Sequence, residues 1–191
     1  MLKQILDWDR EAFIYLNGLG IERYDGFWSA VTEMTTWVPL FVLFLALLFW
    51  KHPRHEAVWM TLTALLLMVF VLLLTNFTKE WVARLRPNNN AEINALIRIL
   101  QSPATYSFFS GHASSSFSLT TLMVLYLRDS FRWRHLFFVW PLLFALSRIY
   151  VGVHYPIDIL VGAGVGALAG ILFYRGYSNL ILPYIQSGRR V

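Results

Sequence analysis

The chain has 191 residues, of which 57% are hydrophobic and 14% charged, and its mean hydropathy is +0.53. This balance excludes an ordinary soluble domain, and the length corresponds to one domain. The absence of cysteine excludes disulfides, thiol catalysis and Cys-ligated metals. A net charge of +5 would suggest nucleic acid in a soluble protein. Here the basic residues lie at the ends of apolar segments, so we expect an integral membrane protein with no nucleic-acid partner.

The first twenty residues predict an amphipathic helix that lies on the membrane surface. Apolar residues recur at helical spacing over residues 2–16, opposite a charged face, and Gly18 and Gly20 mark its end. The charges interrupt the apolar core that a cleavable signal peptide would have, so we expect no such peptide. The alternative is that residues 1–20 form an additional span.

Five apolar segments predict an all-α, polytopic transmembrane helix bundle in a single domain. Residues 57–78 are uncharged and long enough to cross a bilayer at about 1.5 Å per residue. In the first segment, Pro39 predicts a kink and Glu33 predicts either a buried polar contact between helices or a place in the site. The spans are expected at residues 25–50, 57–78, 111–127, 136–150 and 156–174.

Small residues in two of these segments indicate close helix packing. In the third segment they are serines, which alternatively could line a path to the site; in the fifth they are glycines at four-residue spacing. The residues are Ser114, Ser115, Ser116, Ser118, Gly162, Gly166 and Gly170.

Residues 88–109 form the longest polar connection. Ile93, Leu96, Ile97 and Leu100 recur at a helical spacing, which predicts a short amphipathic helix. That helix could act as a lid or lipid-access ramp, or it could be a merely structural interfacial helix. The sequence leaves both open.

Three short motifs place chemically capable side chains at the ends of the predicted spans. Lys79 to Pro87 reads K-x6-R-P, Ser110 to His112 reads S-G-H, and Ser147 to Asp158 reads S-R-x5-H-x3-D. The four-residue spacing would let Asp158 orient His154, while Arg148 faces the same point. A cation, a nucleophile and an orienting carboxylate are what phosphoryl transfer uses. The alternative is a membrane-edge cluster whose basic side chains reach lipid headgroups.

In order and spacing, these motifs resemble the signature motifs of the type 2 phosphatidic acid phosphatase superfamily, in its membrane branch. One departure is Phe109, where that family usually has proline. The resemblance implies that His154 attacks phosphorus to form a phosphohistidine and that Asp158 orients it. His112 would protonate the leaving oxygen and then activate water. The implied phosphate-binding residues are Lys79, Arg86, Ser110, Gly111 and Arg148.

We expect no cofactor and no metal, because three fixed cations can balance the phosphoryl charge. Arg84, which lies within the first motif, is expected to be an ordinary surface charge.

With five spans, the four helix ends that carry the motifs share one membrane face. The opposite face is rich in basic residues, and the positive-inside rule then places the motifs outside the cytoplasm. We expect a bacterial inner membrane protein with its site facing the periplasm or the outside. The basic residues of the opposite face are Lys51, Arg54, Arg128, Arg132, Arg134, Arg175, Arg189 and Arg190.

The expected substrate is a lipid with a terminal phosphate, with undecaprenyl diphosphate as the first choice. Phosphatidylglycerol phosphate, phosphatidic acid and a lipid A phosphate are the alternatives. A related haloperoxidase is disfavoured because such proteins are soluble. A non-catalytic protein that binds or moves lipids is the alternative from another class. The sequence does not fix an oligomeric state.

Overall fold

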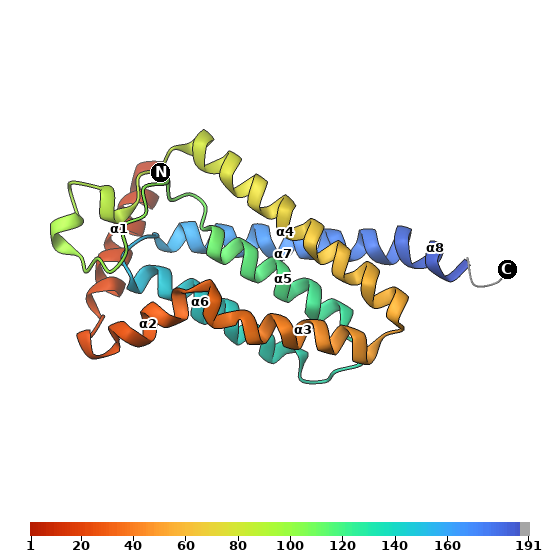
Figure 1. Cartoon of the computed structure of the whole chain (residues 1–191). Coiled ribbons are helices and arrows are strands. Elements are labelled where there is room, and N and C mark those ends of the chain that lie inside the picture. The colour runs from red at the N-terminus through yellow and green to blue at the C-terminus, as the bar shows by residue number, and fades with distance from the viewer. Residues whose placement is uncertain (188–191) are drawn as a thin grey trace.

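A computed structural model describes residues 1–187, and all regular structure in that part is helical. Arg189 and Arg190 lie outside it. Short 3₁₀ turns and one π-helical turn, Tyr177–Ile181, connect or extend the α-helices (Figure 1). The α-helices are α1 (Leu2–Gly18), α2 (Asp25–Thr32), α3 (Val38–Lys51), α4 (Arg54–Val82), α5 (Gly111–Tyr126), α6 (Val139–Tyr150), α7 (Pro156–Gly176) and α8 (Leu182–Ser187).

Helix α5 is the centre of the bundle. It contacts α4, α6 and α7, and Figure 1 shows it in the middle of the bundle, with α4 above it and α3 below it. Ser114, Ser116 and Leu122 on this helix are completely buried. A helix that is small or apolar on every side can be surrounded in this way, because no face of it needs water. A core that contains the aromatic residues Phe44 of α3 and Trp140 and Phe144 of α6 lies inside the bundle.

Helices α5 and α7 approach each other more closely than any side chain would permit. A Cβ atom built on Gly162, Gly166 or Gly170 would lie 2.7, 2.2 or 2.7 Å from a carbonyl oxygen of α5 or of the residue before it. The glycine packing face predicted from the sequence is therefore confirmed. The buried serines opposite are small too, and Ser116 and Ser118 donate to carbonyls of their own helix.

Within residues 1–187, three stretches have the length and hydropathy to cross a membrane: Met34–Lys51, Arg54–Asn89 and Pro156–Ser187. Helices α5 and α6 have 16 and 12 residues and run alongside them (Figure 1). The chain is an integral membrane helix bundle, and the count of five spans stays a prediction.

The first predicted span, residues 25–50, is broken. Helix α2 ends at Thr32, Glu33 has an extended backbone, and a 3₁₀ turn leads into α3. The kink expected in the first half of this span is present as this break, which lies just before Pro39; Pro39 itself is in the first turn of α3, where a helix tolerates proline. The predicted buried contact of Glu33 is wrong: its side chain is exposed and accepts a hydrogen bond from Gln101.

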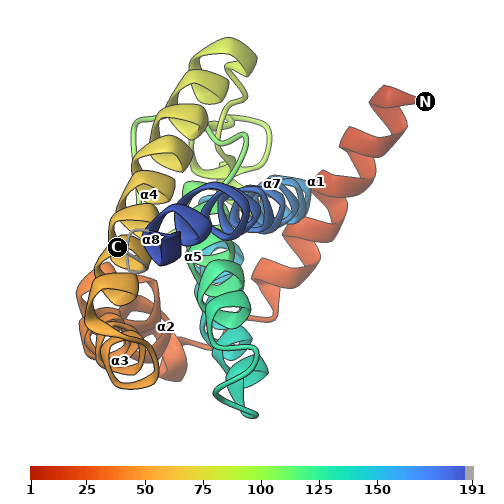
Figure 2. The same ribbon diagram turned by 90° about the vertical axis from the view of Figure 1, so that its right-hand side faces the viewer.

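The predicted N-terminal helix is present as α1. Its apolar residues Ile5, Leu6 and Leu16 are exposed, whereas Phe13 is buried against the ends of α6 and α7. Figure 2 shows α1 beside α7, across the bundle from α3. Its place relative to the membrane stays a prediction, but one face of α1 belongs to the protein interior.

The amphipathic helix predicted within residues 88–109 is wrong. The segment contains only 3₁₀ turns, Pro87–Asn89 and Asn94–Leu96, among the described elements. Its backbone finds distant partners instead. The Arg98 N–H donates to the Asn17 side chain at 2.7 Å, and the Leu100 N–H donates to the Val151 carbonyl at 3.1 Å. Because those donors are already satisfied by α1 and by the chain after α6, the segment does not need helical bonds.

Candidate active site

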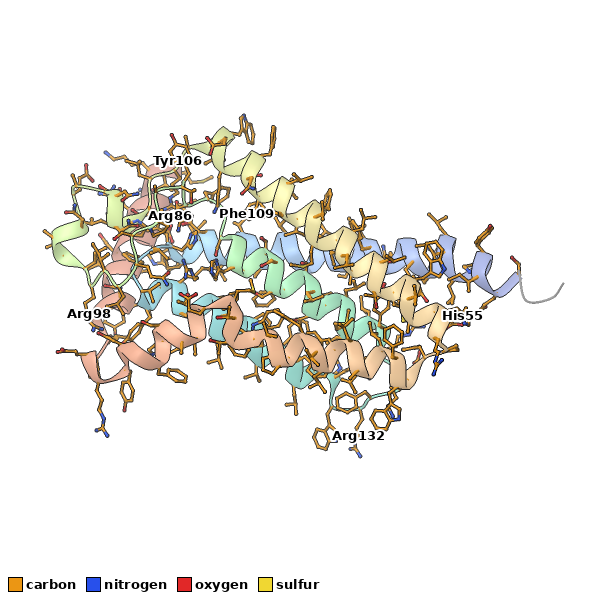
Figure 3. The ribbon with its side chains drawn as sticks, in the orientation of Figure 1. His55, Arg86, Arg98, Tyr106, Phe109 and Arg132 are labelled. Carbon is orange, nitrogen blue, oxygen red and sulfur yellow. The ribbon has the colours of Figure 1, made fainter. Side chains whose placement is uncertain are left out.

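The three motifs meet at one end of the bundle. The end of α4, the start of α5, the end of α6 and the start of α7 are all at this end (Figure 1). Figure 3 shows Arg86 and Arg98 at this end, with His55 and Arg132 at the other. Residues separated by up to 79 positions in sequence, from Lys79 to Asp158, are thereby brought to one place.

His154 and Asp158 make the contact that their spacing predicts. After α6 the chain turns through Gly152, whose φ of +85° favours glycine, and Pro156 starts α7. This places Asp158 in the first helical turn, where its Oδ2 accepts the Tyr155 N–H at 3.1 Å. The same oxygen lies 3.4 Å from Nδ1 of His154. Both side chains are buried, so their geometry is fixed by the fold.

The contact with Arg86 determines which nitrogen of His154 carries the ring proton, and burial together with this contact lowers the pKa of the ring. Its Nη1 lies 3.1 Å from His154 Nε2. Because guanidinium only donates, Nε2 must accept and the ring proton belongs on Nδ1, facing Asp158. Burial, and then the charge of Arg86, hold the pKa of His154 well below its usual value. A neutral imidazole with its Nε2 lone pair directed at the cationic groups is a competent nucleophile.

Arg86 and Arg148 are held by neutral groups. Arg86 donates to the carbonyl and the hydroxyl of Thr105 at 2.6 and 2.9 Å. Arg148 donates to the Gln101 side chain at 2.9 Å and to the Thr32 hydroxyl. Such partners fix the position of a guanidinium without neutralising it.

A pocket of about 400 Å³ opens beside Lys79, and among the described residues that line it there is neither Arg86, Arg148 nor His154. Lys79, Gly111 and His112 line its polar part, and the His112 ring packs against Phe144 with 4.7 Å between centroids. Among the ion pairs of the described residues, none joins Lys79, Arg86 or Arg148 to a carboxylate. With no carboxylate in ion-pair contact, these three cations can bind an anion with several oxygens, such as a phosphoryl group.

Ser110 has a structural role, and its part in phosphate binding stays a prediction. Its hydroxyl oxygen caps α5 by accepting the Ala113 N–H at 3.4 Å, and its own N–H donates to the Asp158 carbonyl at 3.0 Å. The residue therefore joins the starts of α5 and α7. Phe109, which replaces the expected proline, is buried, and α5 still begins at Gly111.

Arg84 is not the surface charge that the sequence suggested. It donates to Asp158 Oδ1 at 2.7 Å and to Asp9 Oδ2 at 2.6 Å. Sequence analysis also missed Asp9 and the two partners of Arg148, Thr32 and Gln101. Arg84 could have been noticed because it lies in the first motif, but no pattern in the sequence links Asp9 to it.

Among residues 1–187, no three His, Asp or Glu side chains gather as they would around a metal ion.

The family model of the PAP2 superfamily matches residues 57–182, which include all three motifs. The chain belongs to the PAP2 superfamily. This PAP2 protein is 32% identical over 182 residues to a lipid A 4'-phosphatase of Porphyromonas gingivalis, a match that covers 92% of this chain and 75% of the relative.

Two further similarities place this PAP2 protein among membrane phosphatases. It is 29% identical over 175 residues to an undecaprenyl-diphosphatase of Sulfolobus acidocaldarius, covering 83% of this chain and 82% of the relative. Its fold matches the crystal structure of a transmembrane PAP2-type phosphatidylglycerolphosphate phosphatase from Bacillus subtilis. That match has a TM-score of 0.74 at 21% identity and covers 93% of this chain and 88% of the other. The chain is a membrane lipid phosphatase.

Proposed function

We propose that this phosphatase removes a phosphate from a glycolipid of the lipid A type. The similarity to the lipid A 4'-phosphatase covers more of the chain, at higher identity, than the similarity to the undecaprenyl-diphosphatase. This reverses the order of substrates expected from the sequence. Undecaprenyl diphosphate is the second candidate, supported by the Sulfolobus relative.

The observation that carries the proposal is an apolar groove that continues the charged pocket. A second pocket of about 420 Å³ lies among α3, α4 and α5, and Met34 and Met68 line both pockets. Its other walls include Phe41, Leu45 and Leu65. A lipid phosphate fits this arrangement, with its phosphate beside Lys79 and an acyl chain along α3 and α4.

The chemistry we propose proceeds in two displacements. Lys79, Arg86 and Arg148 bind the phosphoryl oxygens. Nε2 of His154 attacks phosphorus and the bond to the lipid oxygen breaks, while Asp158 stabilises the imidazolium that forms.

His112 then completes the turnover. It gives its proton to the departing lipid oxygen and next takes one from the water that attacks the phosphohistidine, releasing inorganic phosphate and free His154. Acid–base help of this kind is worth about 10²–10⁴-fold.

We also propose that the site faces away from the cytoplasm in a bacterial inner membrane. Six basic residues predicted for the cytoplasmic face lie within the described part of the chain: Lys51, Arg54, Arg128, Arg132, Arg134 and Arg175. Of the eight basic residues predicted for the motif face, three belong to the proposed site, which leaves Lys3, Arg10, Arg23, Arg84 and Arg98. The remaining charge asymmetry agrees with the positive-inside rule.

The test is phosphate release by the detergent-purified protein, with chelator present, beside His154→Ala. The panel contains lipid A, undecaprenyl diphosphate, phosphatidylglycerol phosphate and phosphatidic acid. We expect the highest kcat/KM with lipid A and no turnover in the variant. A quenched reaction with ³²P-labelled substrate should give protein-bound label that acid removes and alkali retains.

Three outcomes would contradict the proposal in different ways. A higher kcat/KM with undecaprenyl diphosphate would replace the substrate and keep the mechanism. Full activity of His154→Ala would remove the mechanism. A folded protein that binds these lipids and releases no phosphate from any of them would be a lipid-binding protein.

A further inference from the structure

The carboxylate that orients His154 is itself held by a chain of buried charges. Oδ2 of Asp158 serves His154 and the Tyr155 N–H, whereas its Oδ1 accepts from Arg84 at 2.7 Å. The other end of the Arg84 guanidinium donates to Asp9 at 2.6 Å. The order is therefore His154, Asp158, Arg84, Asp9, and its last member comes from the N-terminal helix α1.

Every link in this chain is sheltered from water. Asp9 and Asp158 are completely buried, and the Arg84 side chain is 17% exposed. The Arg84 guanidinium also lies 4.0 Å from the ring centroid of Tyr155. Hydrogen-bonded ion pairs in a dry setting are strong and well directed, so this arrangement has little freedom to move.

Asp9 fixes two parts of the site at once. Its Oδ2 accepts from Arg84, and its Oδ1 accepts the Ile157 N–H at 2.9 Å. Ile157 lies in the first turn of α7, next to Asp158. Asp9 thus holds both Arg84, which contacts Asp158, and the backbone of α7 next to Asp158.

The charge balance gives Asp9 an electrical effect as well. With Asp9 ionised, Arg84 is shared by two carboxylates, and the three groups keep one negative charge beside His154. Without Asp9, Arg84 would neutralise Asp158 alone, and the imidazolium formed during phosphoryl transfer would lose its stabilising charge. The ionisable groups around His154 are Lys79, Arg84, Arg86, His112, Arg148 and Asp158.

We propose that Asp9, acting through Arg84, is a positioning residue that sets both the place and the charge of Asp158. The inference rests on the proposed function, in which His154 is the nucleophile. It assigns to α1 a part in catalysis, although α1 lies outside the matched family region, residues 57–182.

The test compares Asp9→Asn with Asp7→Asn, which removes the same charge from an exposed position of the same helix. Orienting partners behind a site typically contribute about 10- to 100-fold in activity. We expect a loss of that size in kcat for Asp9→Asn with KM unchanged, and no change for Asp7→Asn. Removing a negative charge disfavours the imidazolium, so the acid limb of the kcat/KM profile should move to lower pH.

A double-mutant cycle tests the route through Arg84. In an Arg84→Gln background, Asp9→Asn should cost much less than it costs alone, because the link is already broken. Independent, additive losses would overturn the proposal. So would a wild-type kcat and pH profile in Asp9→Asn.

If Asp9→Asn does not fold, Arg84→Lys takes its place. Lysine keeps the positive charge but cannot span two carboxylates as the guanidinium does. We expect the same loss in kcat, and wild-type kcat would overturn the proposal. His154→Ala, purified in the same way, distinguishes failure of the proposed function from failure of the role of Asp9. Activity that survives in His154→Ala would contradict the proposed function. If His154→Ala is inactive but Asp9→Asn and Arg84→Lys have wild-type activity, only the role of Asp9 is contradicted.

Discussion

The pair α5–α7 and the pair α3–α4 are packed in opposite ways. Between α5 and α7, glycines let the backbones touch, with only 2.2 Å available for a Cβ on Gly166. Between α3 and α4, large side chains such as Phe41 and Leu65 leave an apolar groove of about 420 Å³. The first pair presents the starts of both helices to the site, and the second leads from the site toward the lipid.

The tightly packed pair holds the proposed catalytic groups in place, and the loosely packed pair leaves room for the substrate to enter. His154 and Asp158 need fixed positions relative to His112, and the close backbone contact of α5 with α7 provides them. The substrate is a lipid that must enter from the side, and a loosely packed pair can admit a chain without disturbing the catalytic groups. Lys79, on α4, is the proposed phosphate-binding residue that the open pair contributes.

The largest effect should come from removing that lysine. Lys79→Met should lower kcat by about 10²–10³-fold, the usual cost of losing one stabilising donor to a developing anion. Lys51→Met, at the other end of the bundle, is the control and should retain wild-type turnover. Equal turnover by both variants in the phosphate-release assay would mean that the open side contributes no catalytic charge.

A bulky residue in the tight pair should come next. Gly166→Leu forces α5 and α7 apart and should lower the free energy of unfolding by about 1–3 kcal/mol or more. Gly164→Leu is the control, because nothing lies within 4 Å of a Cβ there. Thermal unfolding in detergent measures both, and similar midpoints would contradict the close packing of α5 on α7.

A larger side chain in the apolar groove between α3 and α4 should affect substrate binding alone. Leu65→Trp, which alters the apolar groove and not the pocket beside Lys79, should raise KM about tenfold for long-chain lipid phosphates, at a cost of about 1.4 kcal/mol, with kcat and the folded state unaffected. A soluble short-chain phosphate should show no change. Leu66→Trp, on the exposed side of the same helix, is the control. An effect on both substrates would indicate a disturbed site rather than a blocked groove.

The smallest effect concerns pH. The pKa of His154 is lowered by burial and by Arg86, so the ring gains its inactivating proton only below its ordinary value of 6.5. The acid limb of kcat/KM should therefore lie below pH 6.5. Arg86→Gln removes a positive charge, which favours the imidazolium, so the limb of its residual activity should move to higher pH. A shift in the other direction would contradict the contact of Arg86 with His154.

Local spacing in the sequence determined the parts of the site that one helix or turn can fix. The His154–Asp158 contact follows from a four-residue spacing around Pro156, and the packing face of α7 follows from glycines repeated every four residues. Helical geometry converts such spacings directly into positions. The lengths of the apolar segments predicted the helical membrane fold, and the resemblance of the three motifs indicated the family.

Tertiary structure alone decided which charges meet. Arg84 and Arg86 are two residues apart, yet Arg84 is neutralised by two carboxylates and Arg86 by none of those described. Asp9 reaches its partner in α7 across 148 residues. The predicted helix in segment 88–109 is absent for the same kind of reason, since Asn17 and Val151 accept the backbone N–H groups of Arg98 and Leu100. Long-range hydrogen bonds and ion pairs depend on how helices are stacked in space, and no local period in a sequence records that arrangement.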